Sequence, residues 1–365
     1  HDKREDWFSL LQILKHKLEL TVGEEQIPVY LRIAGVYSAH MSDIRQAVKT
    51  YAELLSFFPA LPQAVDELEL IVNEQEEKED AFQLIKPILE GLEEWERLLM
   101  VMASFEKSVD IDDRKVAVLH EMAEIADTRL NALERAFALT GDALAVAPGD
   151  GLLADYLLDL GKRAGLLESV VEVYGRLGND APNMNDQVAL LLRKASVLKD
   201  ELRDYPRAIE EYEGLRELSQ DPIILASLDE LYAATENWEK LTGILMDEAM
   251  VEPDQNTKLN YYYRLALVFE EMLSDAQKAC DVLKEAYQLD QTNEETLSRL
   301  RRIYDDFVSD EEAAFILETH YSNAERWDDV SAVLQKRFER AETVSDRLDI
   351  GRKLIGVLLD KLADE

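Results

Sequence analysis

The chain has 365 residues, of which 47% are hydrophobic and 32% are charged, while Gly (14) and Pro (9) are scarce. This composition is typical of helices rather than of turn-rich sheets, so we expect an all-α protein. Acidic residues outnumber basic ones by 76 to 40, and the net charge of −36 makes nucleic acids and anionic membrane surfaces unfavourable partners. The acidity has two open interpretations, attraction of basic partners or solubility alone.

The single cysteine, Cys280, excludes a disulfide within the chain and a thiolate metal cluster. It follows Ala279 at a repeat position, so we expect a small core residue there. A chain without disulfides fits a reducing compartment, and we expect a cytoplasmic protein with the periplasm left open. No apolar run approaches the roughly 20 residues that span a bilayer, so direct membrane insertion is not expected.

A short segment recurs five times along the chain, with a Trp or Leu followed three residues later by a branched apolar residue. It opens at Trp7, Trp95, Leu167, Trp238 and Trp327. A second segment follows 28 residues later (27 in the first copy), centred on Ala34, Ala123, Ala195, Ala266 and Ile355. A fixed internal period indicates a repeat array. We therefore expect one solenoid over residues 1–365, with copies at 7–94, 95–166, 167–237, 238–326 and 327–365, as an excerpt of a longer array.

Helical periodicity and turn residues divide the copies into helices in chain order. Copy one predicts helices near 6–20, 29–40, 43–58, 64–73 and 77–90, and copy two near 115–128, 131–147 and 152–163. Copy three predicts 167–177, 187–202, 205–218 and a helix that starts at Asp221-Pro222, and copy four predicts 258–273 and 275–289. Ser42 and Ser274 are expected as N-caps, and the segments from Thr292 to Glu295 and from Ser309 to Glu312 as capping boxes.

The copies are long, short, short and long in chain order. The distances between their first residues are 88, 72, 71 and 89 residues. The excess lies between Ala47 and Trp95 and between Ala279 and Trp327, each 48 residues, against about 30 in the two short copies. We expect one extra helix in each long copy and about twenty helices in total.

These residues resemble the tetratricopeptide repeat, whose pattern is W-x2-L-G-x2-Y, a small Ala, an aromatic residue, Ala-Leu and Pro. Copy two shows it best, with Leu119, Met122-Ala123, Ala136, Ala143-Leu144 and Pro148. The resemblance, to a divergent array of bacterial type, implies a right-handed α-α superhelix of about twenty antiparallel helices. The two small residues, such as Ala123 and Ala136, are one position further apart than is usual in the family, which predicts a helix-joining turn longer by one residue.

The resemblance also implies where a partner binds. In that family the first helix of each pair lines the concave surface, and the inner positions here are Leu31 and Gly35, His120 and Glu124, Leu192 and Ser196, and Tyr263 and Leu267. The subclass that clamps a C-terminal carboxylate places Lys, Asn and Arg at these positions. This chain lacks that set, so we do not expect a carboxylate clamp.

Two further features are unusual for this chain. Tyr263 belongs to the run Tyr261-Tyr262-Tyr263, in which Tyr262 is expected in the core and Tyr263 serves either as a contact anchor or in packing. Arg299, Arg301 and Arg302 form the best basic cluster of the acidic chain, and either contact a partner or belong to a solvated face.

Catalytic and metal motifs are missing from the sequence. The five histidines are scattered without HExxH or zinc spacing, and neither a Gly-rich phosphate loop nor GxSxG occurs. We therefore expect no enzyme, no cofactor and no metal. The sequence predicts a scaffold that binds a protein or peptide, with Leu31, His120, Glu124, Leu192, Tyr263, Leu267, Arg299 and Arg302 as candidate contacts. The alternative is a structural building block that associates with copies of itself or within a large assembly.

Overall fold

The computed structural model of the chain describes residues 2–74 and 78–362, and in these residues it is all-helical, with twenty α-helices and no strand. The prediction of an all-α fold with about twenty helices is confirmed. The density of contacts between Cα atoms divides the chain into two compact bodies, an N-terminal body (His1–Val197) and a C-terminal body (Leu198–Glu365).

The helices of the N-terminal body are α1 (Asp2–Leu20), α2 (Ile27–Ala39), α3 (Ile44–Phe57), α4 (Pro62–Glu74), α5 (Glu79–Gly91), α6 (Trp95–Glu106), α7 (Asp112–Thr128), α8 (Leu133–Val146), α9 (Gly151–Ala164), α10 (Leu167–Asn179) and α11 (Met184–Ser196). Those of the C-terminal body are α12 (Tyr205–Leu218), α13 (Pro222–Ala234), α14 (Trp238–Val251), α15 (Gln255–Leu267), α16 (Ala276–Leu289), α17 (Glu294–Asp306), α18 (Glu311–Asn323), α19 (Trp327–Arg340) and α20 (Val344–Asp360). A 3₁₀ turn, η1 (Gly23–Gln26), precedes α2, and π-helical turns follow α11 and α15 as η2 (Val197–Glu201) and η3 (Val268–Met272).

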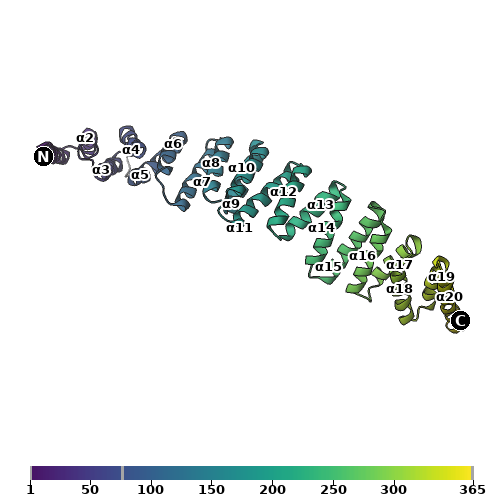
Figure 1. The fold of residues 1–365 in the computed structure, drawn as a ribbon. Coiled ribbons are helices and arrows are strands. Elements are labelled where there is room, and N and C mark those ends of the chain that lie inside the picture. The colour runs from purple at the N-terminus through teal and green to yellow at the C-terminus, as the bar shows by residue number, and fades with distance from the viewer. Residues whose placement is uncertain (1, 75–77, 363–365) are drawn as a thin grey trace. The chain divides into compact units, whose positions relative to one another are not determined.

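Successive helices pack side by side within each body, as Figure 1 shows for the hairpins α7–α8 and α15–α16. The short loops between them bring small residues to the helix crossings. Ala123 on α7 and Ala136 on α8 are both fully buried, and Ala266 on α15 and Ala279 on α16 are 3% and 0% exposed. A side chain without bulk at a crossing lets two helix axes approach closely, so the small residues at fixed spacing specify where the hairpins close.

The two long copies each contain five helices, and the two short ones each contain four, among the residues that the structure describes. The extra helices are α4 and α17. The bounds of α3, α4 and α5 recur at α16, α17 and α18 with a constant offset of 232 residues. The prediction of an inserted helix in each long copy is therefore confirmed, and the two insertions are in the same register.

Four of the predicted N-caps lie one residue too early. The side chains that accept the first free N–H groups of α3, α16, α17 and α18 are Asp43, Asp275, Asn293 and Asp310, not Ser42, Ser274, Thr292 and Ser309. Ser42 and Ser274 instead adopt left-handed backbone, with φ of 54° and 55°. Ser, Asp and Asn are all good N-cap residues, and here the backbone turns at the hydroxyl residue, so the following carboxylate or amide lies at the N-cap position.

The prediction of a turn longer by one residue is wrong in copies three and four. There the additional residue lies in the π-helical turns η2 and η3, and three-residue loops lead on to α12 and α16. A π turn takes one more residue than an α turn within the same helical path. The extra residue thus widens the end of the first helix of the pair instead of the loop.

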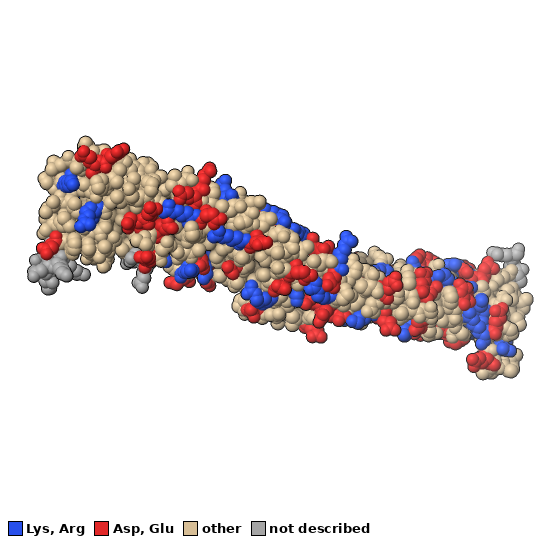
Figure 2. Space-filling model, turned by 90° about the horizontal axis from the view of Figure 1, so that it is seen from above, with Lys and Arg blue, Asp and Glu red and all other residues tan. Residues whose placement is uncertain are grey.

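Ion pairs join alternate helices at matching positions of the repeat. They include Lys86 on α5 with Glu121 on α7 (2.5 Å), and Asp229 on α13 with Arg264 on α15 (2.7 Å). A third pair at this position joins Glu318 on α18 to Lys353 on α20, at 3.3 Å. The position is kept in all three pairs, and the charges are reversed in the Lys86–Glu121 pair relative to the other two. On the face shown in Figure 2, acidic and basic side chains are interspersed along the surface.

Candidate functional site

Tyr263 lies on α15 with its hydroxyl turned toward the start of α17. The hydroxyl donates a hydrogen bond to Oδ1 of Asn293 at 3.0 Å and lies 2.7 Å from Oγ1 of Thr296. Asn293 is the N-cap of α17, and Thr296 is fully buried. The hydroxyl of Tyr263 therefore serves packing between α15 and α17, while its half-buried ring lies at the edge of the exposed surface.

The arginines predicted as contacts lie on α17, beside Tyr263. The guanidinium of Arg299 covers the Tyr263 ring at 4.7 Å from its centre and also binds Glu295 at 2.8 Å. Arg302 binds Glu270 of η3 at 2.6 Å and remains about half exposed. Leu267, one turn after Tyr263, is 38% exposed. The structure thus brings Tyr263, Leu267, Arg299 and Arg302 together as one surface, which we call the α15–α17 patch.

The remaining candidates lie on three separate helices, and of these residues only His120 and Glu124 lie next to each other. Leu31 is half-buried on α2, and Leu192 is half-buried on α11. On α7, His120 lies 3.6 Å from the exposed Glu124, and its ring meets that of Tyr156 on α9 edge-on, with centres 5.6 Å apart. The Nδ1 atom of His120 is buried and has no hydrogen-bond partner among the described residues.

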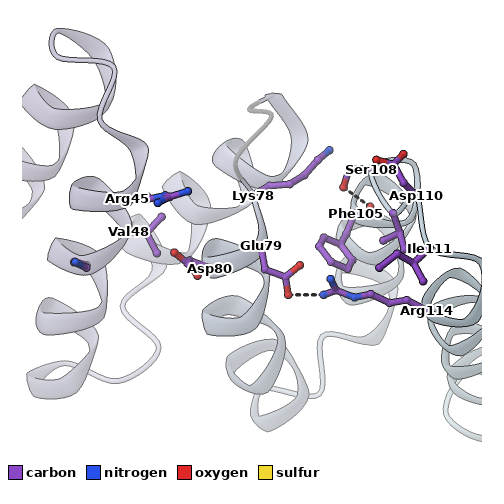
Figure 3. Close-up of a pocket in the computed structure, with 12 residues that line it drawn as sticks. Arg45, Val48, Lys78, Glu79, Asp80, Phe105, Ser108, Asp110, Ile111 and Arg114 are labelled. Carbon is purple, nitrogen blue, oxygen red and sulfur yellow. Dashed lines mark hydrogen bonds and ion pairs between the residues drawn. The ribbon is translucent and has the colours of Figure 1, made fainter.

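A groove of about 760 Å³ lies in the N-terminal body, between α3, the start of α5 and the connection from α6 to α7 (Figure 3). Glu79 and Arg114 form an ion pair across its floor, and the guanidinium of Arg114 lies 5.2 Å from the centre of the Phe105 ring. The ammonium of Lys78 donates to the carbonyl oxygen of Ser104 at 3.0 Å. These contacts hold charged and apolar side chains next to each other at the surface.

The groove differs in charge from the rest of the chain. Basic residues outnumber acidic ones along its wall, with Arg45, Lys49, Lys78 and Arg114 against Glu79, Asp80 and Asp110. The apolar lining comes from Val48, Phe105, Val109 and Ile111, of which Ile111 is 64% exposed. Such a surface can take a carboxylate beside an apolar side chain.

The sequence did not reveal this groove because its basic residues are spread over 70 positions and come from two helices, α3 and α7, and the loop before α5. One signal was present: Arg45 and Lys49 are four residues apart, which places them on one face of a helix. Lys78 and Arg114 join them only in the folded chain, where α3 packs against both α4 and α5.

Neither a metal site nor a membrane span is found in the described part of the chain. No three His, Cys, Asp or Glu side chains are grouped there so that they could hold a metal ion. None of the helices described combines the length and the apolar character needed to cross a membrane. Cys280 is fully buried on α16, as predicted, and burial raises the pKa of its thiol to about 12.

No protein family model matches the chain, and no curated protein matches it. Among solved structures, the apo form of the quorum sensor NprR from B. thuringiensis is similar over 98% of both chains, at 14% sequence identity and a TM-score of 0.25. At that TM-score the two backbones do not superpose closely, so nothing about the function of this chain follows from the likeness.

Proposed function

We propose that this chain is a scaffold for protein–protein interaction, built as a divergent tetratricopeptide-like array, and that the α15–α17 patch is a contact surface for a protein or peptide. The observation that carries the proposal is the arrangement of Tyr263, Leu267, Arg299 and Arg302, in which an aromatic ring, an exposed leucine and two guanidinium groups share one surface. Tyr and Arg are the residue types that most often dominate binding energy at protein interfaces.

The geometry of the patch favours binding because its parts are held in place before a partner arrives. Tyr263 is fixed by Asn293 and Thr296, and Arg302 by Glu270. A side chain that is already ordered loses less conformational entropy on binding. Helical repeats of this kind commonly offer such surfaces to an extended segment or to a partner helix.

The groove in the N-terminal body is a second contact surface in this proposal. Lys49 is exposed at its wall beside Val48, and Ile111 exposes apolar surface opposite. The fitting occupant is a segment that carries a carboxylate next to an aliphatic or aromatic side chain, because its charge complements the cations and its apolar group covers Ile111.

A selection from a display library of random twelve-residue peptides tests the proposal with the full chain as bait. Enriched peptides are then measured by fluorescence polarisation against the wild type, a Leu267→Asp/Arg302→Ala variant of the patch and a Lys49→Glu variant of the groove. We expect one of these two variants to weaken binding by about tenfold or more, as loss of interface hot spots does. Gln288→Asp on α16, an exposed position outside both surfaces, is the control and should leave affinity unchanged.

Failure to enrich any peptide, or equal affinity of the enriched peptides for wild type, patch variant and groove variant, would overturn the proposal. Circular dichroism of each variant confirms that a change in affinity does not come from loss of the fold. An affinity capture with the natural protein would then identify the partner.

Assembly with further copies of the chain is the second candidate function. The observation that favours it is an apolar stripe on α20, where Val344, Leu348, Ile355 and Leu359 are each more than half exposed. Two such stripes can cover each other in an antiparallel helix pair between two copies. Sedimentation velocity over a range of concentrations tests this: self-association that is lost in Leu348→Glu/Ile355→Glu supports it, and a monomer at every concentration contradicts it.

A further inference from the structure

Glu248 on α14 is a glutamate in the interior of the C-terminal body. It is 6% exposed, in the contact of α14 with α13 and α15. Its Oε2 atom is buried and has no hydrogen-bond partner among the described residues. A buried carboxylate that is ionised and unpaired is costly, so this position needs an explanation.

The corresponding positions of the other copies show that Glu248 is the exception. In copies two to five the residue 18 positions before Ala123, Ala195, Ala266 and Ile355 is Phe105, Leu177, Glu248 and Arg337, and in copy one it is the exposed His16. Phe105 and Leu177 are buried and apolar, which suits the site. Arg337 is charged, but it is bound to Glu318 at 2.6 Å and to Glu311, so its charge is compensated.

The charges around Glu248 leave it without such compensation. On α13, Asp229 is 8% exposed, and both its oxygens accept from Arg264 of α15 at 2.7 and 2.8 Å. The guanidinium is thus engaged by the other carboxylate. Tyr261 of α15 is half-buried nearby and adds no positive charge. Of the acids in η3, which also touches α14, Glu270 is bound to Arg302 and Glu271 is exposed.

The matching site in copy five makes the contrast clear. There one carboxylate, Glu318, meets two cations, Arg337 and Lys353. In copy four two carboxylates, Asp229 and Glu248, share one cation, Arg264. The same three positions therefore hold an excess of positive charge in one copy and of negative charge in the other. Both carboxylates of the acidic site are buried.

From this geometry we propose that the protonation state of Glu248 controls how closely α14 packs, and we call this contact a proton-operated joint. When Glu248 is protonated, α14 packs firmly against α13 and α15, and when Glu248 ionises, this packing loosens. A protonated carboxyl carries no charge for Asp229 to repel and can stay in the interior. An ionised one is stabilised by leaving the interior for water.

Burial first and repulsion by Asp229 second raise the pKa of Glu248 from its ordinary 4.5 to about 7, while Arg264 acts in the opposite direction. A raised pKa in the folded state means that the stabilisation is complete below pH 4.5 and is lost as the pH rises to about 7. The joint therefore responds to changes of pH around neutrality. If the α15–α17 patch binds a partner as proposed above, its affinity will follow this titration, because Arg264 and Tyr263 are neighbours on α15.

Hydrogen–deuterium exchange of the full chain, measured without any partner between pH 5.5 and 8.5 and corrected for the intrinsic exchange rate, tests the joint independently of the binding proposal. We expect protection of peptides from α14 and α15 to fall by about tenfold or more over this range, since each unit of pKa shift is worth a factor of ten. Glu248→Gln should remove this fall. Glu239→Gln, an exposed position on the same helix, should retain it.

Protection that does not change with pH, or that changes equally in wild type and Glu248→Gln, would overturn the proposal. Carboxyl ¹³C NMR of the wild-type chain provides a second measurement if Glu248→Gln does not fold. A midpoint near 7 for the Glu248 carboxyl supports the joint, and a midpoint near 4.5 refutes it. Neither measurement involves a partner, so a failed joint leaves the scaffold proposal to be judged by its own peptide assay.

Discussion

Arg264 holds Asp229 with both terminal nitrogens of its guanidinium, at 2.7 and 2.8 Å, and so ties α15 to α13 across a separation of 35 residues in sequence. The carboxylate is buried, and the guanidinium is about half exposed. Such a pair positions two helices through the fixed geometry of its two parallel bonds.

Arg264→Ala should destabilise the C-terminal body by about 2–3 kcal/mol, because it leaves the buried Asp229 without its partner and next to Glu248. Urea denaturation measures the change. Arg352→Ala is the control, since among the described residues Arg352 pairs only with Asp349 of its own helix, and both side chains are well exposed. The effect of the control should stay below about 0.5 kcal/mol. Equal losses of stability in the two variants would show that the Arg264–Asp229 pair stabilises the fold no more than an exposed ion pair does.

Asp127 gives the N-terminal body the opposite response to pH from that of Glu248. Hydrogen bonds from Arg163 lower the pKa of Asp127 below its ordinary value of 3.8, and the hydroxyl of Tyr156 contributes in the same direction. A lowered pKa stabilises the fold above pH 3.8 and ceases to do so as the pH falls through the folded-state value. In Asp127→Asn the loss of stability below about pH 4 should be shallower than in the wild type, as followed by circular dichroism during acid titration. If the stability of Asp127→Asn falls with decreasing pH as steeply as that of the wild type, Asp127 does not contribute to the acid sensitivity of the fold.

Gly161 and Gly141 form a matched pair of buried helical glycines with opposite expected effects. A Cβ atom at Gly161 would lie 2.3 Å from Cγ2 of Val170, whereas one at Gly141 meets nothing within 4 Å. Gly161→Ala should therefore cost about 1–3 kcal/mol through overpacking between α9 and α10. Gly141→Ala should stabilise α8 by about 0.5–1 kcal/mol, because alanine has less freedom to lose on folding. Thermal unfolding of both variants checks the signs, and a stabilising Gly161→Ala would mean that α9 and α10 are less closely packed.

Tyr263→Phe separates the two roles of this side chain. It removes the hydroxyl that bonds Asn293 and Thr296 and keeps the ring beneath Arg299. We expect a loss of about 1 kcal/mol in stability, the usual net value of a hydrogen bond, with peptide binding at the α15–α17 patch retained. Tyr287→Phe on α16 is the control, because its hydroxyl makes no hydrogen bond among the described residues. Loss of peptide binding in Tyr263→Phe at unchanged stability would assign the hydroxyl to the partner instead.

Much of the fold could be predicted from sequence because the repeat signal is a packing signal. Trp95, Leu167, Trp238 and Trp327 are the first residues of α6, α10, α14 and α19, and the small residues lie at the helix crossings. Helix existence followed from that spacing. The N-cap positions could not be predicted from the spacing, because Ser42 and Asp43 are both good N-cap residues and only the backbone path decides between them.

The proposed contact surfaces could be predicted only partly from the sequence. Tyr263 and Arg299 were both predicted as candidates, but their stacking joins residues from different helices and appears only in the folded chain. The groove has the same origin, since Lys49 and Arg114 lie 65 positions apart. Glu248 carried no signal at all, because one more glutamate among 76 acidic residues suggests a solvated face.

The inserted helices α4 and α17 have a consequence for redesign. Their inward positions correspond one to one and are buried in both: Ala64 and Thr296, Val65 and Leu297, Leu68 and Leu300, Ile71 and Ile303, Val72 and Tyr304. Their outward positions differ, with Glu67 and Leu70 on one helix where Arg299 and Arg302 lie on the other. The outward residues of either helix can therefore be transplanted onto the other helix. This would transfer a charged surface from one body to the other and leave the interior of each body unchanged.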